Sequence, residues 1–469
     1  MTVAIKRLLL MQERSLHAPV ALLPDGWARD VRVVIDPDGS IGTASADQEP
    51  RSEDLRLTDR ALLPAPSNLH SHAFQRAMAG RTQVSAAGPD SFWTWRSLMY
   101  KFLGYLTPDH IGAIAAQAQV EMCESGFAAV AEFHYLHHAP GGLPYASLAE
   151  TATRIMESAE ETGIGLTMLP VLYASSGANG APPANGQLRF ASTADSYERL
   201  YSETESTLNQ GPSDWRIGIA PHSLRATPQD ILAETLENHP TGPIHMHIAE
   251  QVDEVEEIRA TWGMRPVEWL LEHHSVDDRW CAVHATHMTP KERQELANSG
   301  AVAGLCPVTE ADLGDGTFPC IEYVESGGRY GVGTDSNVRI TFAGELAQLE
   351  YSQRIEHRCR NALAEPGSST GRTLFESALA GGVQALNRPS GAIQAGSLAD
   401  LLTLDTSRAA FQSLQGDEVL DAWIFSERES AVSDVWSAGR HVVRDGLHER
   451  RKPVAARYRR AILELAANL

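Results

Sequence analysis

Short apolar runs alternate with longer amphipathic stretches through the middle of the chain. Eight runs of strand length recur, and most of them are followed by residues with helical periodicity. The predicted strands are Ala61–His70, Ala128–Tyr135, Gly165–Tyr173, Arg216–His222, Ile244–Glu250, Cys281–His284, Val302–Val308 and Gly331–Asp335. Strand and helix in eightfold alternation predict an α/β fold, a (β/α)8 TIM-like barrel.

The stretches between these strands have the apolar spacing of helices that cover such a barrel. The predicted helices are Asp109–Glu124, Leu148–Thr162, Gln229–His239, Val252–His274 and Pro290–Ser299. One connection is different, because Ser175–Gln187 is rich in Gly, Ala and Pro. We expect it to form a long loop able to close over a pocket.

Both ends of the chain show short strand-like runs instead. They are Val20–Leu23, Val31–Ile35, Gly396–Asp405, Asp421–Phe425 and His441–Val443. We predict that residues 1–60 and 391–469 form one small discontinuous β-sandwich domain, which ends in a C-terminal helix. Residues 61–390 would then form the barrel.

Charge and composition narrow the class of protein. Lys and Arg number 39 against 60 Asp and Glu, so the net charge is −21. This balance argues against nucleic acid or an anionic membrane surface as the main partner, but it leaves room for a small anionic substrate. No apolar run is long enough to span a membrane. Five scattered cysteines without a C-x-x-C pair, and an N-terminus unlike a signal peptide, predict a cytoplasmic protein.

Histidines and a carboxylate at the predicted strand ends suggest a metal site. His70 and His72 share one face of a strand, since residues i and i+2 point the same way. Alone, this pair is more typical of two hydrogen-bonded rim histidines than of a metal site. His247, nearer the rim than His245, and Asp335 join it, because barrel strands end at one rim. Three imidazoles and a carboxylate suit one catalytic Zn²⁺, although Fe²⁺ shares such ligands.

The distribution of lysine argues for one metal ion rather than two. The only lysines are Lys6, Lys101, Lys291 and Lys452, and none ends a predicted barrel strand. A lysine-bridged pair of metal ions is therefore excluded. Glu250, His284 and His287 follow the fifth and sixth strands, and we expect one of the two histidines to contact the reacting centre.

Several segments together resemble a known family. NLHSHAFQRAMAG, EFHYLHH, PHSLRA, HMHIAEQ, CPVTEADLGDGTFP, GTDSN and LEYSQRIEHRCRN are similar to the formimidoylglutamate deiminases of the amidohydrolase superfamily. The resemblance runs from about residue 60 to 365 and extends more loosely over both ends. It implies zinc-dependent hydrolysis of N-formimino-L-glutamate to N-formyl-L-glutamate and ammonia in histidine degradation, by a homodimer.

The resemblance also implies roles for individual residues. The zinc ligands would be His70, His72, His247 and Asp335. The groups that handle protons would be Glu250, His284 and Asp335. The substrate contacts would be Gln75, Tyr135, His222 and Arg225. Asn337 stands where many relatives are expected to have histidine, but no proposed ligand is lost.

A glutamate derivative has two carboxylates, so its pocket needs two cationic partners. Arg225 offers a bidentate pair to one of them. Arg96 is the candidate for the other, and its alternative interpretation is a solvated helix charge beside core tryptophans. The alternative functions are deamination of a purine or other cyclic amidine, which Arg225 with Gln75 and Tyr135 disfavours, and a catalytically silent barrel.

Overall fold

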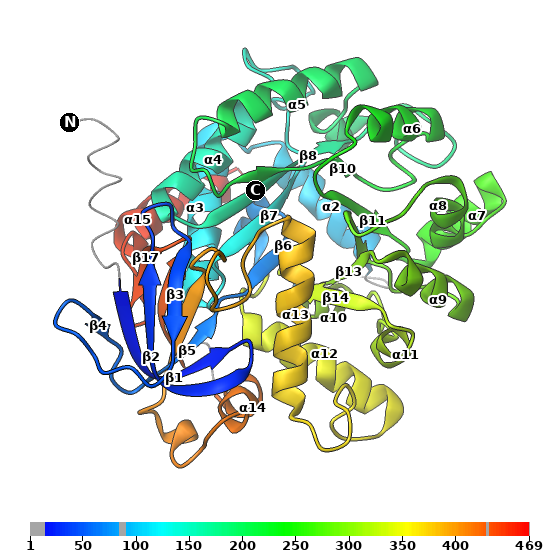
Figure 1. Cartoon of the computed structure of the whole chain (residues 1–469). Coiled ribbons are helices and arrows are strands. Elements are labelled where there is room, and N and C mark those ends of the chain that lie inside the picture. The colour runs from blue at the N-terminus through cyan, green and yellow to red at the C-terminus, as the bar shows by residue number, and fades with distance from the viewer. Residues whose placement is uncertain (1–14, 84–90, 428–430, 469) are drawn as a thin grey trace.

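The computed structural model describes residues 15–83, 91–427 and 431–468. Its centre is a ring of parallel strands (Figure 1). These are β6 (Ser67–Ser71), β7 (Ala129–His134), β8 (Gly165–Leu172), β9 (Arg216–Ile217), β10 (Ala220–Pro221), β11 (Ile244–Ile248), β12 (Trp280–His284), β13 (Val302–Leu305) and β14 (Arg329–Val332). They form two arcs, β6 to β10 and β11 to β14. Single parallel bridges, Ile219 to Ile244 and Ser71 to Asp335, join the arcs into a barrel.

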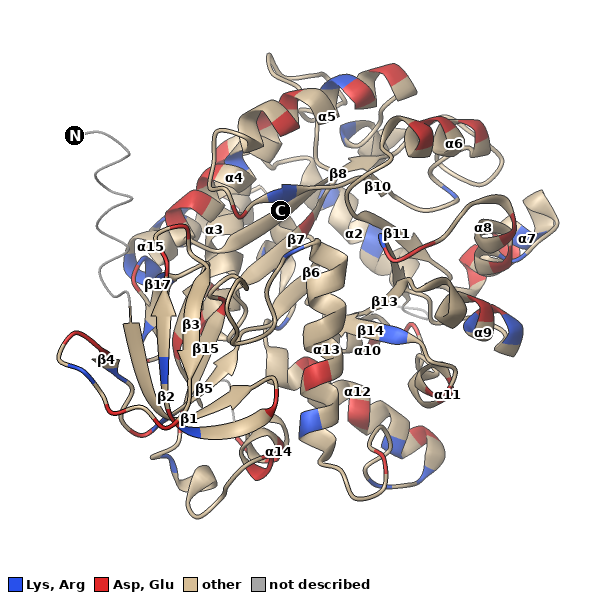
Figure 2. Cartoon of the chain, viewed as in Figure 1, with Lys and Arg blue, Asp and Glu red and all other residues tan. Residues whose placement is uncertain are grey.

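Helices surround this ring. They include α2 (Phe92–Leu103), α3 (Pro108–Glu124), α4 (Glu150–Thr162), α5 (Ala194–Leu208), α6 (Gln229–Asn238), α7 (Val252–Trp262), α8 (Pro266–His273), α9 (Pro290–Ser299), α10 (Pro307–Leu313), α11 (Cys320–Glu325), α12 (Phe342–His357) and α13 (Thr370–Leu386). Several begin as their sequences dictate, since Thr107, Thr193 and Thr289 accept a backbone N–H in the first turn. Acidic residues recur along the outer helices in Figure 2, while the central strands contain few charged residues.

Strands from both ends of the chain pair in a second sheet. It contains β1 (Ser15–Leu23), β2 (Gly26–Ile35), β3 (Ile41–Ser45), β4 (Leu55–Arg56), β5 (Arg60–Pro64), β15 (Leu401–Asp405), β16 (Val432–Ser437), β17 (Arg440–Arg444) and β18 (Leu447–His448). Strand β5 joins the two ends, because it pairs parallel to β1 and antiparallel to β15. Helix α15 (Arg451–Ala466) follows β18. The predicted fold class, an α/β barrel with a small β domain from both ends, is confirmed.

Several predicted elements differ from the structure. Arg216–His222 is divided into β9 and β10, and Val302–Val308 ends as a strand at Leu305, since Pro307 begins α10.

Three further differences are larger. Ala61–His70 is not one strand, because Pro64 and Pro66 interrupt the hydrogen bonding and leave β5 in the terminal sheet and β6 in the barrel. Val252–His274 is two helices, since Gly263 ends α7 with a φ of 80° and Pro266 begins α8. Asp421–Phe425 belongs to helix α14 (Glu418–Phe425). The apolar residues of this segment follow one another directly, so their pattern distinguishes neither a strand nor a helix.

A buried ion network ties the barrel to the terminal sheet. Arg388, which follows α13, contacts Asp214 at 3.0 Å and Asp400 at 2.6 Å. Arg440 on β17 contacts the same Asp214 at 2.7 Å. Burial alone would raise the pKa of Asp214, but Arg440 and Arg388 hold it well below its usual value.

In the described part of the chain, no helix is long and apolar enough to cross a membrane.

We expect Asp214→Asn to lower the free energy of unfolding at pH 7 by about 3–5 kcal/mol, because two buried guanidinium groups lose a partner. A carboxyl with a lowered folded-state pKa stabilises the protein above its unfolded-state pKa of about 3.9. The difference from the wild type should thus be equal at pH 7 and pH 5 and narrow only below about pH 4.

Urea unfolding followed by circular dichroism measures this difference. Asp445→Asn is the matched control, since Asp445 pairs with Arg60 while its side chain is 88% exposed. Equal losses of stability in the two variants would contradict the role given to the network.

Candidate active site

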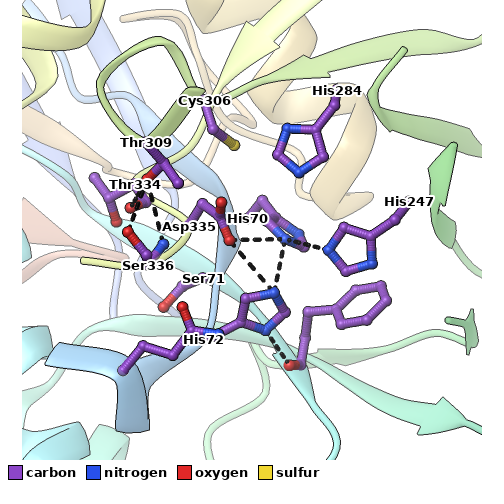
Figure 3. Close-up of polar contacts among 12 residues, drawn as sticks. His70, Ser71, His72, His247, His284, Cys306, Thr309, Thr334, Asp335 and Ser336 are labelled. Carbon is purple, nitrogen blue, oxygen red and sulfur yellow. Dashed lines mark hydrogen bonds and ion pairs between the residues drawn. The ribbon is translucent and has the colours of Figure 1, made fainter. Parts of the chain in front are cut away.

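Three histidines converge at the carboxyl end of the barrel (Figure 3). Nε2 of His70 lies 3.2 Å from Nε2 of His72 and 3.1 Å from Nε2 of His247. Oδ1 of Asp335 lies 3.5 Å from Nε2 of His70 and 3.4 Å from Nε2 of His72. The structure therefore brings all four predicted ligands to one point, within reach of a single metal ion.

The outer nitrogens of two of these rings determine which atoms face that point. Nδ1 of His72 donates to the carbonyl of Phe133 at 2.9 Å, and Nδ1 of His247 donates to the carbonyl of His222 at 3.1 Å. Because a carbonyl only accepts, both Nε2 atoms direct lone pairs inward. Lone pairs and a carboxylate gathered at a buried point need a cation between them. The donor set fits a divalent metal ion, and its N and O atoms suit zinc.

Burial favours the uncharged form of these histidines. It lowers the pKa of His70 and His247 well below the usual value, and neighbouring histidines add to the effect. Burial also lowers the pKa of His72, although Asp335 and the bond to Phe133 oppose it. Neutral imidazole is the form that binds metal, so the barrel interior keeps the cluster ready for an ion.

The prediction that Asp335 ends the eighth strand is wrong, because Asp335 lies three residues beyond β14. The backbone makes this possible at Gly333, where a Cβ atom would lie only 2.7 Å from the backbone nitrogen of His70. Asn337 then fastens the segment, because its Nδ2 lies 3.0 Å from the carbonyl oxygen of Asp335 and 3.2 Å from that of His72. The residue that departs from the expected family pattern thus binds the ligand segments together.

Glu250 and His284 lie beside the cluster, with Glu250 Oε1 3.8 Å from His284 Nε2. Burial raises the pKa of Glu250 to about 7, and Glu254 adds to the rise. For His284, burial alone would lower the pKa, but Glu250, Glu310 and Asp335 raise it to about 10. One side chain thus holds a proton near neutral pH while the other exchanges one, as acid and base groups must.

Two buried glutamates support this pair and were not predicted. Glu310 on α10 accepts from Nδ1 of His284 at 3.2 Å and from the backbone nitrogen of Cys306 at 2.8 Å. Glu254 on α7 accepts from the backbone nitrogen of Glu250 at 3.0 Å. In sequence each resembles an ordinary acidic residue in a first helical turn, so only the fold reveals their function as supports.

A pocket opens in front of the cluster. It is lined by His72, Gln75, Phe92, Trp95, Arg96, Met99, Tyr100, Tyr135, Tyr173, Phe190, His222, Arg225, His247, Glu250, His284, Leu313 and Asp335. The predicted substrate contacts all occur in this lining. Gln75 donates to the hydroxyl of Tyr135 at 2.8 Å, so these two act as one unit.

Two arginines enter the pocket, and neither has a carboxylate partner in the part of the chain that the structure describes. Arg96 donates to the hydroxyl groups of Tyr100 at 2.6 Å and Tyr173 at 3.4 Å. Arg225 is 8% exposed, and among the described residues its guanidinium makes no hydrogen bond or ion pair. Buried cations usually have an anionic partner. The pocket is therefore built to receive negative charge from outside the chain.

Other candidate residues lie outside the cluster. Nε2 of His245 donates to the carbonyl of Ala385 at 2.8 Å, and His245 is not part of the pocket lining, which fits the deeper position predicted for it. Nε2 of His287 donates to the carbonyl of Asp315 at 2.8 Å, and His287 is not part of the pocket lining. The loop from Ser175 borders the site, since Ser175 Oγ donates to the carbonyl of Arg225 at 2.8 Å.

A closed parallel barrel with a histidine and aspartate cluster on its carboxyl rim defines a class of metal-dependent hydrolases. The model of the amidohydrolase family matches residues 61–442, and that of the N-terminal domain of formimidoylglutamate deiminase HutF matches residues 13–57. Formimidoylglutamate deiminase of Pseudomonas aeruginosa is 47% identical over 92% of this chain and 95% of its own. The chain therefore belongs to the amidohydrolase family and, within it, to the formimidoylglutamate deiminases.

Solved structures agree with this assignment. The crystal structure of an amidohydrolase from Brucella melitensis is 46% identical, with a TM-score of 0.93 over 97% of this chain and 100% of that one. A zinc-bound adenosine deaminase from Xanthomonas campestris has a TM-score of 0.81 at 21% identity, covering 97% of this chain and 98% of its own. The second likeness shows the fold alone. The predicted resemblance to the formimidoylglutamate deiminases is confirmed.

Proposed function

We propose that this chain hydrolyses N-formimino-L-glutamate to N-formyl-L-glutamate and ammonia, a step of histidine degradation. The observation that carries the proposal is the pair of arginines, Arg96 and Arg225, which line the pocket of the histidine cluster and have no carboxylate partner among the described residues. The relative with 47% identity bears the name of this activity. A dicarboxylate supplies the two negative charges that the pocket lacks.

The substrate's position follows from the places of these groups. Arg225 holds one carboxylate and Arg96 the other, with Gln75 and Tyr135 as neutral donors. These contacts with the two carboxylates direct the formimino end of the substrate toward the histidine cluster. A purine would bring no charge to either guanidinium, so the pocket disfavours deamination of a base.

The chain's own groups can carry the protons of the reaction. His70, His72, His247 and Asp335 would hold one Zn²⁺, or Fe²⁺ with the same ligands. When bound, the ion lowers the pKa of a water molecule toward about 7 and makes it a nucleophile. Asp335 accepts the proton of the attacking water. His284 donates a hydrogen bond to the tetrahedral centre that forms at the formimino carbon.

Departure of nitrogen completes the hydrolysis. Glu250, with a pKa near neutrality, passes a proton to the amino group that leaves. The carbon–nitrogen bond breaks, and the nitrogen departs as ammonia with both protons of the water molecule, the one first held by Asp335 and the one released from the hydroxyl group as the carbon becomes the formyl carbonyl. A cytoplasmic location and a homodimer remain predictions. The five cysteines, all described and unpaired, support the first of these.

We expect the purified, zinc-loaded protein to release ammonia from N-formimino-L-glutamate. Arg225→Gln removes a charged hydrogen-bonding partner and should raise KM roughly 10–100-fold, with a smaller effect on kcat. Asp335→Asn should lower kcat by about 10²–10⁴-fold or more, since it removes the proton acceptor. Coupled detection of ammonia measures both parameters.

Arg259→Gln is the matched control for Arg225→Gln, because Arg259 lies on the outer side of α7 in an exposed pair with Glu256. A panel of purines and their nucleosides accompanies the assay. Turnover of a purine without turnover of N-formimino-L-glutamate would refute the proposed substrate, while the assignment as a metal-dependent hydrolase would still hold. No turnover of any compound by metal-loaded protein would overturn the activity altogether.

We expect the isolated protein to hold about one equivalent of transition metal per chain, and His247→Ala to lose most of it on dialysis. The substitution removes one of the four proposed ligands, which are the three clustered histidines and Asp335. Elemental analysis by mass spectrometry gives the metal content. His239→Ala is the control, since this histidine pairs with Glu198 outside the cluster. Full metal content in a folded His247→Ala protein would refute the ligand set.

A further inference from the structure

One tryptophan lies against both arginines of the pocket. The guanidinium carbon of Arg96 is 5.5 Å from the ring centroid of Trp93, and that of Arg225 is also 5.5 Å from it. Trp93 and Arg96 are three residues apart on α2, so they share a helix face. Arg225 comes from the loop after β10. A single indole therefore bridges two cations that arrive from different parts of the barrel.

The same side chain also connects α2 to a third element. Nε1 of Trp93 donates to Oδ2 of Asp253 at 2.9 Å, and Asp253 lies in the first turn of α7, three residues after Glu250. The hydrogen bond fixes the ring along one direction, while its face stays available to the guanidiniums. Helix α2, the loop that carries Arg225 and the start of α7 are joined at this point.

The two arginines depend on Trp93 to different degrees. Arg96 also has hydrogen bonds to Tyr100 and Tyr173, and Tyr173 accepts from Gln187 at 2.9 Å. Arg225 has no such bonds from its guanidinium within the described residues. Two like charges close together repel in a buried pocket, and the negative face of an indole attracts both. Arg225 thus relies on Trp93 for its position until an anion arrives.

We propose that Trp93 is a positioning residue that sets the spacing of Arg96 and Arg225 and so selects a dicarboxylate over a monocarboxylate. This rests on the proposed function, because the two carboxylates are those of the substrate. Trp93 is not part of the pocket lining that contains the proposed metal ligands and the groups that move protons. Its removal should thus weaken substrate binding much more than it slows the chemical step.

The test compares Trp93→Ala and Trp93→Phe with the wild type. We expect Trp93→Ala to raise KM for N-formimino-L-glutamate about 10-fold and to leave kcat within about 3-fold. Trp93→Phe should recover part of the loss, since phenylalanine keeps an aromatic face. Calorimetric binding of N-formyl-L-glutamate, compared with N-formylglycine as a monocarboxylate, should show the same loss for the dicarboxylate alone.

A double-mutant cycle separates positioning from general damage. In an Arg225→Gln background, Trp93→Ala should add less than about 3-fold to KM, because one of the two cations is already gone. Trp27→Ala is the matched control: its indole N–H also donates to an aspartate, Asp417 at 2.7 Å, but in the terminal sheet. If Trp93→Ala does not fold, Trp93→Leu keeps the apolar bulk without an aromatic face.

Several results would overturn the proposal: a fall in kcat without a change in KM, an equal effect in the Arg225→Gln background, or Trp93→Phe as weak as Trp93→Ala. Equal losses for the dicarboxylate and the monocarboxylate would do the same. If the wild type binds the dicarboxylate but does not turn over N-formimino-L-glutamate, the proposed function fails while the role of Trp93 is still decided by calorimetry.

Discussion

The convergence of three neutral imidazoles and one carboxylate on a buried point is the constraint on which the rest of the site depends. Such a set of electron pairs is stable in a protein interior only around a cation. The barrel supplies what the cluster needs: β6 and β11 direct Nε2 atoms inward, and backbone carbonyls fix the ring protons on the outer side. Glu250 and His284 then acquire their pKa values from the same burial and from each other.

The contact that closes the barrel also brings the residues of the cluster together. The bridge from Ser71 to Asp335 joins the first strand to the last, and Ser71 lies between His70 in β6 and His72 just after it. Gly333 permits that approach, and Asn337 stabilises it through hydrogen bonds to the carbonyl groups of His72 and Asp335. A chain that fails to close here would lose the aspartate ligand together with the fold. The site is therefore as rigid as the barrel. Its catalytic groups are held in place before the substrate binds, as preorganised catalysis requires.

The sequence was enough to predict the barrel and the cluster, because strand ends in a parallel barrel share a rim and a His-x-His spacing places both rings on one face. It did not reveal where Pro64 and Pro66 divide one apolar run between two sheets, or that the apolar run in α14 is helical. Glu310, Tyr100 and Tyr173 carry no local pattern that separates them from ordinary helix or core residues. Their positions depend on contacts between elements far apart in the chain, as does the contact of Trp93 with Arg225.

The most direct test of the account is a crystal structure of the metal-loaded protein with N-formyl-L-glutamate, the proposed product. We expect one metal ion among His70, His72, His247 and Asp335, the formyl group facing it, and the two carboxylates on Arg225 and Arg96. A product bound with a carboxylate at the metal ion and its formyl end at the arginines would contradict the account, and so would a product bound outside this pocket.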